Sequence, residues 1–511
     1  PFSFAVDLFG PLEVEHVSLG QWITLPGGER RPQSWRILAR AGKVDLTIAL
    51  SLVETFDDRS VSLRGSSGMA RLDYAADALV VTRDNTADLV LNPLIKELSR
   101  AGAHLREGLR NAFRQAASLN QKSPYGLSFR ATIAAFYDGI RAGQPDPRFA
   151  PASARAVMQG IEDALARLPA LPAVPARPHG TPRPRVMVIG GTGFIGRNLT
   201  RRLVERGHDV RVLSRGHNGP FPDIADHVET LGVSLRDEDR LAAAMQGMDC
   251  VFNLAKSTDK NWQAALENDV ATTERIGRAA IRAGIGRLVH TGTIASYDMS
   301  DPARTITEAT DFGEMETRNI YARSKAEGER RLIAMQAQGL RLVIARPGIV
   351  LGDGGPLQHW GIGRWHGAGA VRLWGNGRNI LPFVLADDVS DGLIAMMERD
   401  EAIGESFNLI GEPMFSGRDY FDAIHRRTGA RLKVSGSNLT ALWAVDAVKQ
   451  GLKRHVLRRK GASPASLADW KSRGHLSRFD NAKPKRLLGW APESDRDAFW
   501  RRAIDEAHLF W

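Results

Sequence analysis

Three regularly spaced glycines, Gly190, Gly193 and Gly196, are the residues whose spacing says most about chemistry. They follow the apolar run 186–189, which predicts a buried strand, and they open a helical pattern. Glycine lets the backbone turn sharply and approach a pyrophosphate, and the N-terminus of the following helix offers it free N–H groups. The spacing therefore predicts a dinucleotide-binding turn, although a tight strand–helix turn without a ligand has the same pattern.

A tyrosine and a lysine further along the chain have the spacing of an acid/base pair. Tyr321 and Lys325 lie on a helical pattern that continues through Leu332, and residues four apart share a helix face. A nearby ammonium stabilises a phenolate, so Tyr321 can pass a proton to or from a carbonyl or an alcohol. Upstream, 289–297 predicts a strand that ends in hydroxyl residues. Thr293 there can bind a substrate oxygen, or it can be a strand-end hydroxyl satisfied within the fold.

The order of these motifs is a second signal. A glycine turn, a strand-end hydroxyl, the Tyr-x-x-x-Lys pair and Arg346-Pro347-Gly348 follow one another within 185–511. This region resembles the extended short-chain dehydrogenase/reductase family, also called the NAD-dependent epimerase/dehydratase family. Further family-like pieces are 251–255, 268–270, 381–389, 405–409 and 480–490. The resemblance implies an α/β fold, a Rossmann-type doubly wound parallel sheet with a small C-terminal substrate-binding subdomain.

The resemblance also implies roles for individual residues. Thr293, Tyr321 and Lys325 would be the catalytic set, with Tyr321 as the acid/base and Lys325 on the nicotinamide ribose. The residues that would bind the cofactor are Gly190, Gly193, Phe194, Ile195, Gly196, Ser214, Arg215, Leu254, Ala255, Tyr321, Lys325 and Pro347. The residues of the variable segment that would contact the substrate are His359, Trp360, Arg364 and Arg378.

The end of the second predicted strand bears on which cofactor binds. The run 209–213 leads into Ser214-Arg215. An acidic residue about 20 residues past the glycines favours NAD, whereas an arginine accommodates the 2′-phosphate of NADP. Arg215 therefore favours NADP over NAD, and an arginine that stacks on the adenine or faces solvent is the alternative. Further on, the chain offers Ser234 where many relatives hold the adenine with an aspartate.

The expected reaction is hydride transfer on a nucleotide-activated sugar, by an epimerase or a 4-keto reductase. Sugar dehydratases of the family carry Asp-Glu after the catalytic threonine, and Ile294-Ala295 stand here, so a dehydratase is not expected. The first alternative is an NADP-dependent reductase or dehydrogenase of a non-nucleotide carbonyl or alcohol, which the apolar residues at 373–374 and 381–383 would suit. The second is a cofactor-sensing or scaffold protein without turnover, against which the intact catalytic set argues.

Prolines recur through 169–184, which predicts a semi-rigid linker between 1–168 and 185–511. The strands expected in 1–168 are 12–17, 44–52, 60–63, 70–74 and 79–82, followed by helices at 93–117, 127–141 and 152–168. Strands before helices predict an α+β domain with a mostly antiparallel open sheet. The glycine hairpin 60–74 and the segment 136–143 resemble the C-terminal domain of Gfo/Idh/MocA oxidoreductases. The nucleotide-binding half of that family is absent, so dimerisation or shaping of a substrate site is the role expected.

The composition of the chain argues against several other classes of protein. The one cysteine, Cys250, lies in a buried-strand pattern, so neither a disulfide framework nor a metal site is expected, as in a cytoplasmic protein. No apolar run is long enough to span a bilayer. The chain begins with Pro1 and no leader, so we expect a longer natural protein. Nucleic-acid binding is not expected, and a homodimer is, because both resembled families commonly form dimers.

A basic cluster at 449–460 adds to the formal net charge of +11. A helical stripe lies beneath it, made of Leu442, Val445, Val448, Leu452 and Val456. The segment 442–460 has two functional interpretations, weak contact with a membrane surface and binding of an anionic substrate. The structural alternative is a helix packed by its stripe with a solvated basic face.

Overall fold

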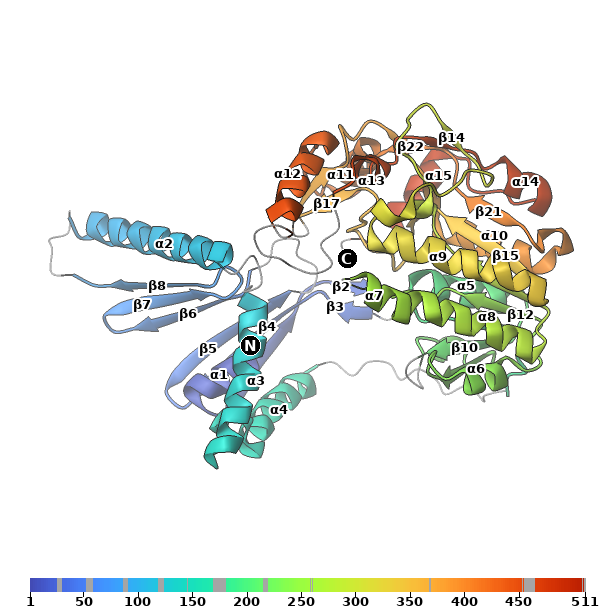
Figure 1. The fold of residues 1–511 in the computed structure, drawn as a ribbon. Coiled ribbons are helices and arrows are strands. Elements are labelled where there is room, and N and C mark those ends of the chain that lie inside the picture. Colours follow the sequence, from blue (N-terminus) through green and yellow to red (C-terminus); the bar gives the residue numbers. More distant parts are fainter. Residues whose placement is uncertain are drawn as a thin grey trace. The chain divides into compact units, whose positions relative to one another are not determined.

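The computed structural model describes residues 1–511 except 25–29, 52–57, 86–90, 118–123, 145, 169–180, 215–218, 258, 260, 367–368, 453, 455–464, 508 and 510–511. The chain forms two compact units (Figure 1), of which the first contains Pro1–Ile23 and Arg31–Ala173 and the second contains Thr24–Arg30 and Val174–Trp511. No helix in the described ranges is both long and apolar enough to cross a membrane.

The first unit is built on antiparallel strands, as the sequence predicted. One sheet contains β1 (Glu13–Leu19), β4 (Ser34–Ala41) and β5 (Val44–Ser51), a second contains β6 (Ser60–Gly65), β7 (Gly68–Asp73) and β8 (Ala78–Arg83), and β2 (Trp22–Thr24) pairs with β3 (Arg30–Pro32). The helices are α1 (Phe2–Phe9), α2 (Leu91–Ala117), α3 (Pro124–Ala142) and α4 (Pro151–Ala166). Helices α1 and α4 pack on the first sheet through a core that includes Val6, Ile37 and Ala164.

The second unit is organised around seven parallel strands. They are β9 (Val186–Ile189), β10 (Val210–Ser214), β11 (Val228–Gly232), β12 (Cys250–Asn253), β13 (Arg287–Thr291), β15 (Leu342–Pro347) and β21 (Ser406–Leu409). Their order is β11-β10-β9-β12-β13-β15-β21, with every neighbouring pair parallel. The strand order reverses between β9 and β12, which confirms the Rossmann-type doubly wound sheet.

Helices cover both faces of this sheet (Figure 1). Those on one face are α5 (Phe194–Glu205) and α10 (Ala386–Glu398), and those on the other are α6 (Glu238–Met245), α8 (Ala271–Ala283) and α9 (Ile320–Met335). Strand β9 shows why both faces need cover: Val186 and Val188 enter one core, and Met187 and Ile189 enter the other. A strand buried on both sides is apolar throughout, as the run 186–189 is.

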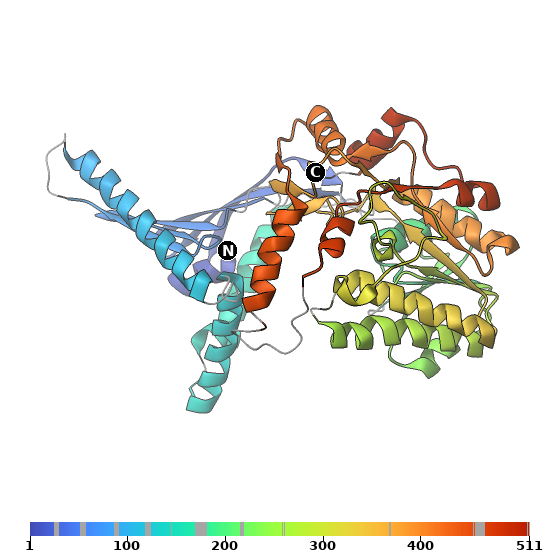
Figure 2. The same cartoon turned by 45° about the horizontal axis from the view of Figure 1, so that its top comes forward.

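A smaller set of elements comes from the segments after β13 and β15 and from the part of the chain after β21 (Figure 2). The strands are β14 (Thr305–Ile306) with β24 (Arg478–Phe479), β16 (Ile349–Leu351) with β20 (Phe383–Leu385), β19 (Ile380–Leu381) with β22 (Phe415–Ser416), and β17 (Gly363–Trp365), β18 (Ala370–Leu373) and β23 (Lys433–Ser435). The helices are α11 (Gly417–Thr428), α12 (Leu439–Gly451), α13 (Leu467–Ser472), α14 (Ala482–Leu488) and α15 (Arg496–Trp500).

The predicted stripe at 442–460 is only partly packed. Leu442 lies against a cluster formed by Trp374, Leu439 and Trp470. Val445, Val448 and Leu452 instead face solvent, with 69%, 65% and 52% of their surface exposed. The interpretation of a helix packed by its whole stripe is therefore wrong for these three residues, because α12 turns its inner face to the tryptophans. Val456 lies outside the described residues.

Candidate active site

The glycine turn connects the end of β9 to the start of α5. Gly190 has a φ of 81°, a left-handed conformation that glycine tolerates, and a Cβ there would lie 3.2 Å from the carbonyl carbon of Leu254. Gly193 precedes the first turn of α5, and its N–H donates to the Gly190 carbonyl at 3.0 Å. A Cβ on Gly196 would overlap the Gly190 carbonyl oxygen. The turn therefore requires glycine at Gly190 and Gly196, and it aims the N-terminus of α5 past the end of β9.

The residues after β12 lie beside this turn. The Leu254 N–H donates to the Ile189 carbonyl at 3.0 Å, and the Ala255 N–H donates to Asn253 Oδ1 at 3.1 Å. Ligands of doubly wound sheets bind at the carboxyl ends of the strands where the strand order reverses. The glycine turn and the segment after β12 flank that point here. Free helix N–H groups beside glycines without side chains fit the pyrophosphate of a dinucleotide.

Lys325 connects the predicted acid/base helix to this edge. Its buried ammonium donates to the Ala255 carbonyl at 3.2 Å and forms an ion pair with Asp269 Oδ1 at 3.2 Å. The second oxygen of Asp269 accepts from the Ser324 hydroxyl at 2.7 Å. Asp269 stands in a π-helical turn, η3 (Leu266–Val270), that interrupts the helix between α7 (Trp262–Ala265) and α8. Such turns often occur at functional sites, and this one fixes the position of Lys325.

Tyr321 and Thr293 lie at the ends of neighbouring elements. Tyr321 is the second residue of α9 and is 42% exposed, and its hydroxyl has no partner in the described part of the chain. Thr293 follows β13 and is buried; its Oγ1 accepts from the Ala295 N–H at 3.1 Å. That bond leaves the Thr293 O–H free to donate. The described partners of the Lys325 ammonium are Asp269 and Ala255 rather than the Tyr321 hydroxyl.

A buried histidine, His290, lies on β13, the strand that leads to Thr293. Its Nδ1 is 3.1 Å from Asn253 Nδ2, on the adjacent strand β12. Burial, with the charges of Lys325 and Arg346, lowers the pKa of His290 to about 3. His290 is therefore neutral at pH 7, accepts at Nδ1 from the Asn253 amide, and carries its proton on Nε2. It acts here as an anchor between two strand ends.

A buried ion pair between Glu329 of α9 and Arg346 of β15 holds α9 against the sheet. Arg346 on β15 donates from Nε and Nη2 to Glu329 Oε2 at 2.9 and 2.7 Å, and from Nη1 to the Tyr297 hydroxyl at 2.6 Å. The Tyr297 hydroxyl in turn donates to Asn408 Oδ1 at 3.0 Å. Burial acts to lower the pKa of Arg346, and the charge of Glu329 outweighs it, so Arg346 stays protonated.

The residues predicted to contact the substrate do not all lie together. The loop after β16 passes the glycine turn, because a Cβ on Gly355 would lie 2.8 Å from the Phe194 ring. In that loop His359 accepts from the Gly361 N–H at 3.0 Å, and burial, with the charge of Lys256, lowers its pKa to about 4. Lys256 directly follows Ala255, so His359 lies near the cofactor edge.

The other predicted site residues have different surroundings. Trp360 is exposed, and its carbonyl accepts from the Trp374 ring N–H at 2.6 Å. Arg364 lies opposite Arg372 across strands β17 and β18, and the Arg378 N–H donates to Asn376 Oδ1. Within the described part of the chain, no contact of these two arginines involves His359 or Trp360. The remaining cofactor candidates are Ser214 and Pro347, which end β10 and β15, Ile195 in the first turn of α5, and Arg215, which lies outside the described residues.

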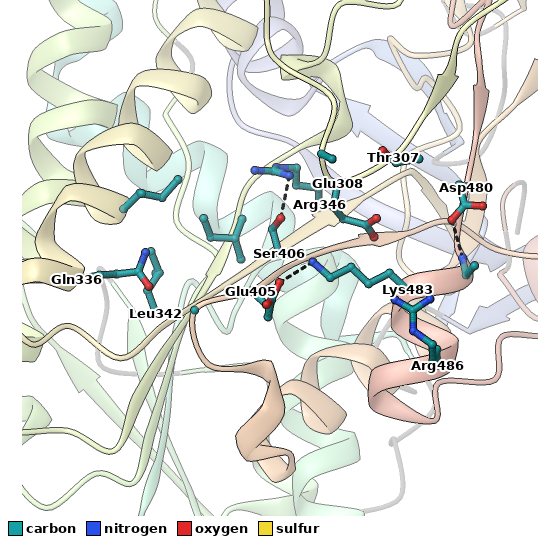
Figure 3. A pocket seen from close by; sticks show the side chains of 15 residues that line it. Thr307, Glu308, Gln336, Leu342, Arg346, Glu405, Ser406, Asp480, Lys483 and Arg486 are labelled. Atoms are coloured by element: carbon teal, nitrogen blue, oxygen red, sulfur yellow. Dashed lines mark hydrogen bonds and ion pairs between the residues drawn. The ribbon is translucent and has the colours of Figure 1, made fainter.

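A second hollow lies away from this edge. It is an open groove of about 480 Å³ (Figure 3) beside the first residues of β15 and β21. Its lining includes Glu308, Arg346, Glu405, Lys483 and Arg486, and Lys483 pairs with Glu405 at 2.7 Å. The lining runs along β15 from Leu342 to Arg346 and includes Gly404 before β21. Among the residues described as lining the groove there is no residue of the glycine turn and neither Tyr321 nor Lys325, so the groove is separate from the site where a cofactor would bind.

A doubly wound parallel sheet, a glycine turn at its switch point and a Tyr/Lys pair anchored beside that turn together define the class of NAD(P)-dependent enzymes with a Rossmann-type domain. Residues 186–409 match the NAD dependent epimerase/dehydratase family. An uncharacterized protein, y4nG, of Sinorhizobium fredii is 30% identical over 322 residues, which cover 60% of this chain and 74% of that protein. The chain therefore belongs to the NAD dependent epimerase/dehydratase family.

Two further similarities mark the limits of this assignment. The 2-alkyl-3-oxoalkanoate reductase of Stenotrophomonas maltophilia is 31% identical over 219 residues, 40% of this chain and 63% of the reductase. The chain thus spans less than two thirds of that relative. The crystal structure of gox2253 is 24% identical, with a TM-score of 0.53, and covers 63% of this chain and 97% of that one. It supports the fold.

Proposed function

We propose that this chain is an oxidoreductase that transfers a hydride between NAD(P) and a carbonyl or alcohol carbon of a small molecule. The observation that carries this proposal is the 3.2 Å contact between the Lys325 ammonium and the Ala255 carbonyl. Ala255 lies beside the glycine turn, and Tyr321 stands one helical turn before Lys325 on α9. The acid/base pair is thereby anchored where the nicotinamide of a dinucleotide would end.

The proposed chemistry divides between the cofactor and three side chains. The bound nicotinamide would supply or accept the hydride. Tyr321 gives its proton to the carbonyl oxygen as the carbon is reduced, and takes it back when the alcohol is oxidised. Thr293 donates a hydrogen bond to the same oxygen, since its own oxygen already accepts from Ala295. Lys325 places a positive charge beside the phenolate that Tyr321 becomes.

The binding roles of the remaining residues follow from their positions. Gly190, Gly193 and Gly196 would hold the pyrophosphate at the start of α5, and Pro347 at the end of β15 would border the nicotinamide. For the adenosine end we retain the sequence-based proposal that Arg215 favours NADP. Ser214 ends β10, at the strand end where the ribose of a dinucleotide would lie. Arg215 follows it in the sequence and lies outside the described residues.

For the substrate we favour a non-nucleotide ketone or its alcohol. The support is the similarity to a protein named 2-alkyl-3-oxoalkanoate reductase. Apolar residues Trp374 and Leu381, both buried, stand in the part of the chain that would close over a substrate. A nucleotide-activated sugar, epimerised or reduced, is the second proposal. It is favoured by the exposed guanidinium of Arg378, which has no partner in the described residues and could bind a diphosphate.

The role of residues 1–168 is likewise a proposal. Their resemblance to the C-terminal domain of Gfo/Idh/MocA oxidoreductases supports a domain that dimerises or borders a substrate site. The family match begins at residue 186 and so leaves this part of the chain outside it.

A paired assay tests the function. The purified chain is given NADPH or NADH with a 2-alkyl-3-oxoalkanoate, and nicotinamide absorbance is followed; UDP-glucose replaces the ketone in the parallel experiment. We expect oxidation of NADPH by the ketone, with NADH less effective. Stabilisation by UDP-glucose in a thermal melt, without stabilisation by the ketone, would favour the second proposal. A chain that binds neither dinucleotide contradicts both.

Asp269 offers a second test of the same site. Asp269→Ala should lower kcat/KM about 100-fold, because an active-site group misplaced by about 1 Å can lose that much. Asp269→Asn keeps one oxygen that accepts from Lys325, and its amide NH2 can donate to the Ser324 hydroxyl, so it should recover part of the loss. Asp259→Asn is the matched control, since Asp259 accepts from the neighbouring Asn268 but does not contact Lys325. Full activity of Asp269→Ala would show that Lys325 needs no anchor.

A further inference from the structure

Helix α12 has two apolar faces, only one of which is packed. Its inner face carries Leu439 and Trp443, which pack with Trp374 and Trp470, and Asp446 there accepts from the Trp470 ring N–H at 3.1 Å. Val445, Val448 and Leu452 occupy the outer face at a spacing of three and four residues, which makes one continuous stripe. Three large aliphatic side chains more than half exposed on one stripe indicate a contact surface.

The charges beside this stripe have a single sign. Lys449 lies four residues after Val445, on the same side of α12, and is exposed without an ion pair within the described residues. Arg454, just past Leu452, is likewise exposed. In the sequence between Asp446 and Asp469 there are six lysines and arginines and no acidic residue. An apolar stripe flanked by cations only has the chemistry of a helix that lies on an anionic lipid surface.

We propose that the outer face of α12, formed by Val445, Val448, Lys449 and Leu452, docks on an anionic lipid bilayer. The valines and Leu452 enter the boundary between headgroups and acyl chains, while Lys449 extends to the phosphates. Electrostatics argue against a second copy of the chain as the occupant, because a symmetric contact would bring two copies of the basic face together. The surface would place the enzyme beside membrane-dissolved substrates, but its existence does not depend on the proposed reaction.

Vesicle flotation with the full chain tests this surface. The chain should float with vesicles of phosphatidylcholine and phosphatidylglycerol in equal parts, stay behind with phosphatidylcholine alone, and bind less as salt rises. Val445→Asn combined with Val448→Asn should weaken binding about tenfold or more, because two apolar contacts are lost. Lys449→Glu should weaken binding to anionic vesicles as well. Ile333→Asn, an exposed aliphatic position on α9, is the matched control and should bind as the parent does.

Three outcomes would overturn the proposal. The parent chain fails to bind anionic vesicles, or the double asparagine variant binds them as tightly as the parent does. In the third, sedimentation shows a dimer that the double variant alone loses, so that the stripe is a contact between copies. Because both valines are solvent-exposed, the variants should melt close to the parent, and a melting curve checks that they are folded.

Discussion

Tyr321→Phe should lower kcat about 10²–10⁴-fold, the contribution expected of a group that moves a proton in the transition state. The substitution removes only the hydroxyl oxygen. That hydroxyl is on a residue 42% exposed and makes no hydrogen bond with the described residues, so the fold should lose little. Cofactor affinity, measured by quenching of protein fluorescence, should stay the same, because Lys325 and the glycine turn are untouched. The measurement is single-turnover oxidation of the dinucleotide at saturating substrate.

An exposed tyrosine elsewhere provides the comparison. Tyr137 is 54% exposed on α3 of the first unit, and Tyr137→Phe removes the same atom from a similar surface. Its activity should equal that of the parent. If Tyr321→Phe retained full turnover, the acid/base assignment would be refuted. A cofactor-sensing protein would then gain support only if the parent also binds a dinucleotide without turning it over.

The parts of this site that could be predicted from sequence are those set by local periodicity. Gly190 and Gly196 were identified by spacing alone, and the structure explains them by a positive φ and by a clash with a carbonyl oxygen. Tyr321 and Lys325 were placed on one helix face by the four-residue interval, and α9 contains both. Fixed backbone geometry makes such short-range inferences dependable. The doubly wound sheet was expected from the resemblance to a family rather than from periodicity, and the observed strand order confirms it.

The parts that were missed depend on contacts across the chain. Asp269 was part of a family-like segment, but its ion pair with Lys325 joins residues that are 56 positions apart. The pairing of Asn253 with His290 arises from the register of two neighbouring strands. Neither has a local signal, because a buried polar group acquires its partner only when the sheet is assembled. Strand β4 was missed because Leu38 adds an apolar residue to its exposed face and blurs the alternation.

The error at α12 has a related cause. Periodicity shows that Val445, Val448 and Leu452 share a face, but it cannot tell which side of a helix meets the core. The inner face of α12 is the packed one because Trp443 and Leu439 contact Trp374 and Trp470, which come from other parts of the chain. Large aromatic rings bury more surface than valines do, and they set the orientation of the helix.

Arg346→Met should destabilise the second unit by about 3–5 kcal/mol, the usual cost of removing one partner of a buried ion pair. Glu329 is fully buried, and Arg346 supplies two of its hydrogen bonds. Burial raises the pKa of Glu329 even with Arg346 present, and loss of the cation raises it further. A large fall in the melting temperature of the second unit is the expected result, with the active-site residues themselves unchanged.

The loss of stability in Arg346→Met should depend on pH. A carboxyl group whose pKa is higher in the folded than in the unfolded state binds more protons when folded, so acid favours folding. The penalty in Arg346→Met should therefore shrink as the pH is lowered and Glu329 takes up its proton. Replacing Glu329 by Gln in the same chain should recover part of the loss, because no buried charge is then left without a partner.

An exposed ion pair supplies the control for this cycle. Arg282 pairs with Asp239, and both side chains are largely in solvent. Arg282→Ala should change the free energy of unfolding by no more than about 1 kcal/mol. An Arg346→Met variant that is as stable as Arg282→Ala would mean that water reaches Glu329. The Glu329 carboxylate would then not be a buried charge, and its ion pair with Arg346 would not be what holds α9, the helix of Tyr321 and Lys325, against the sheet.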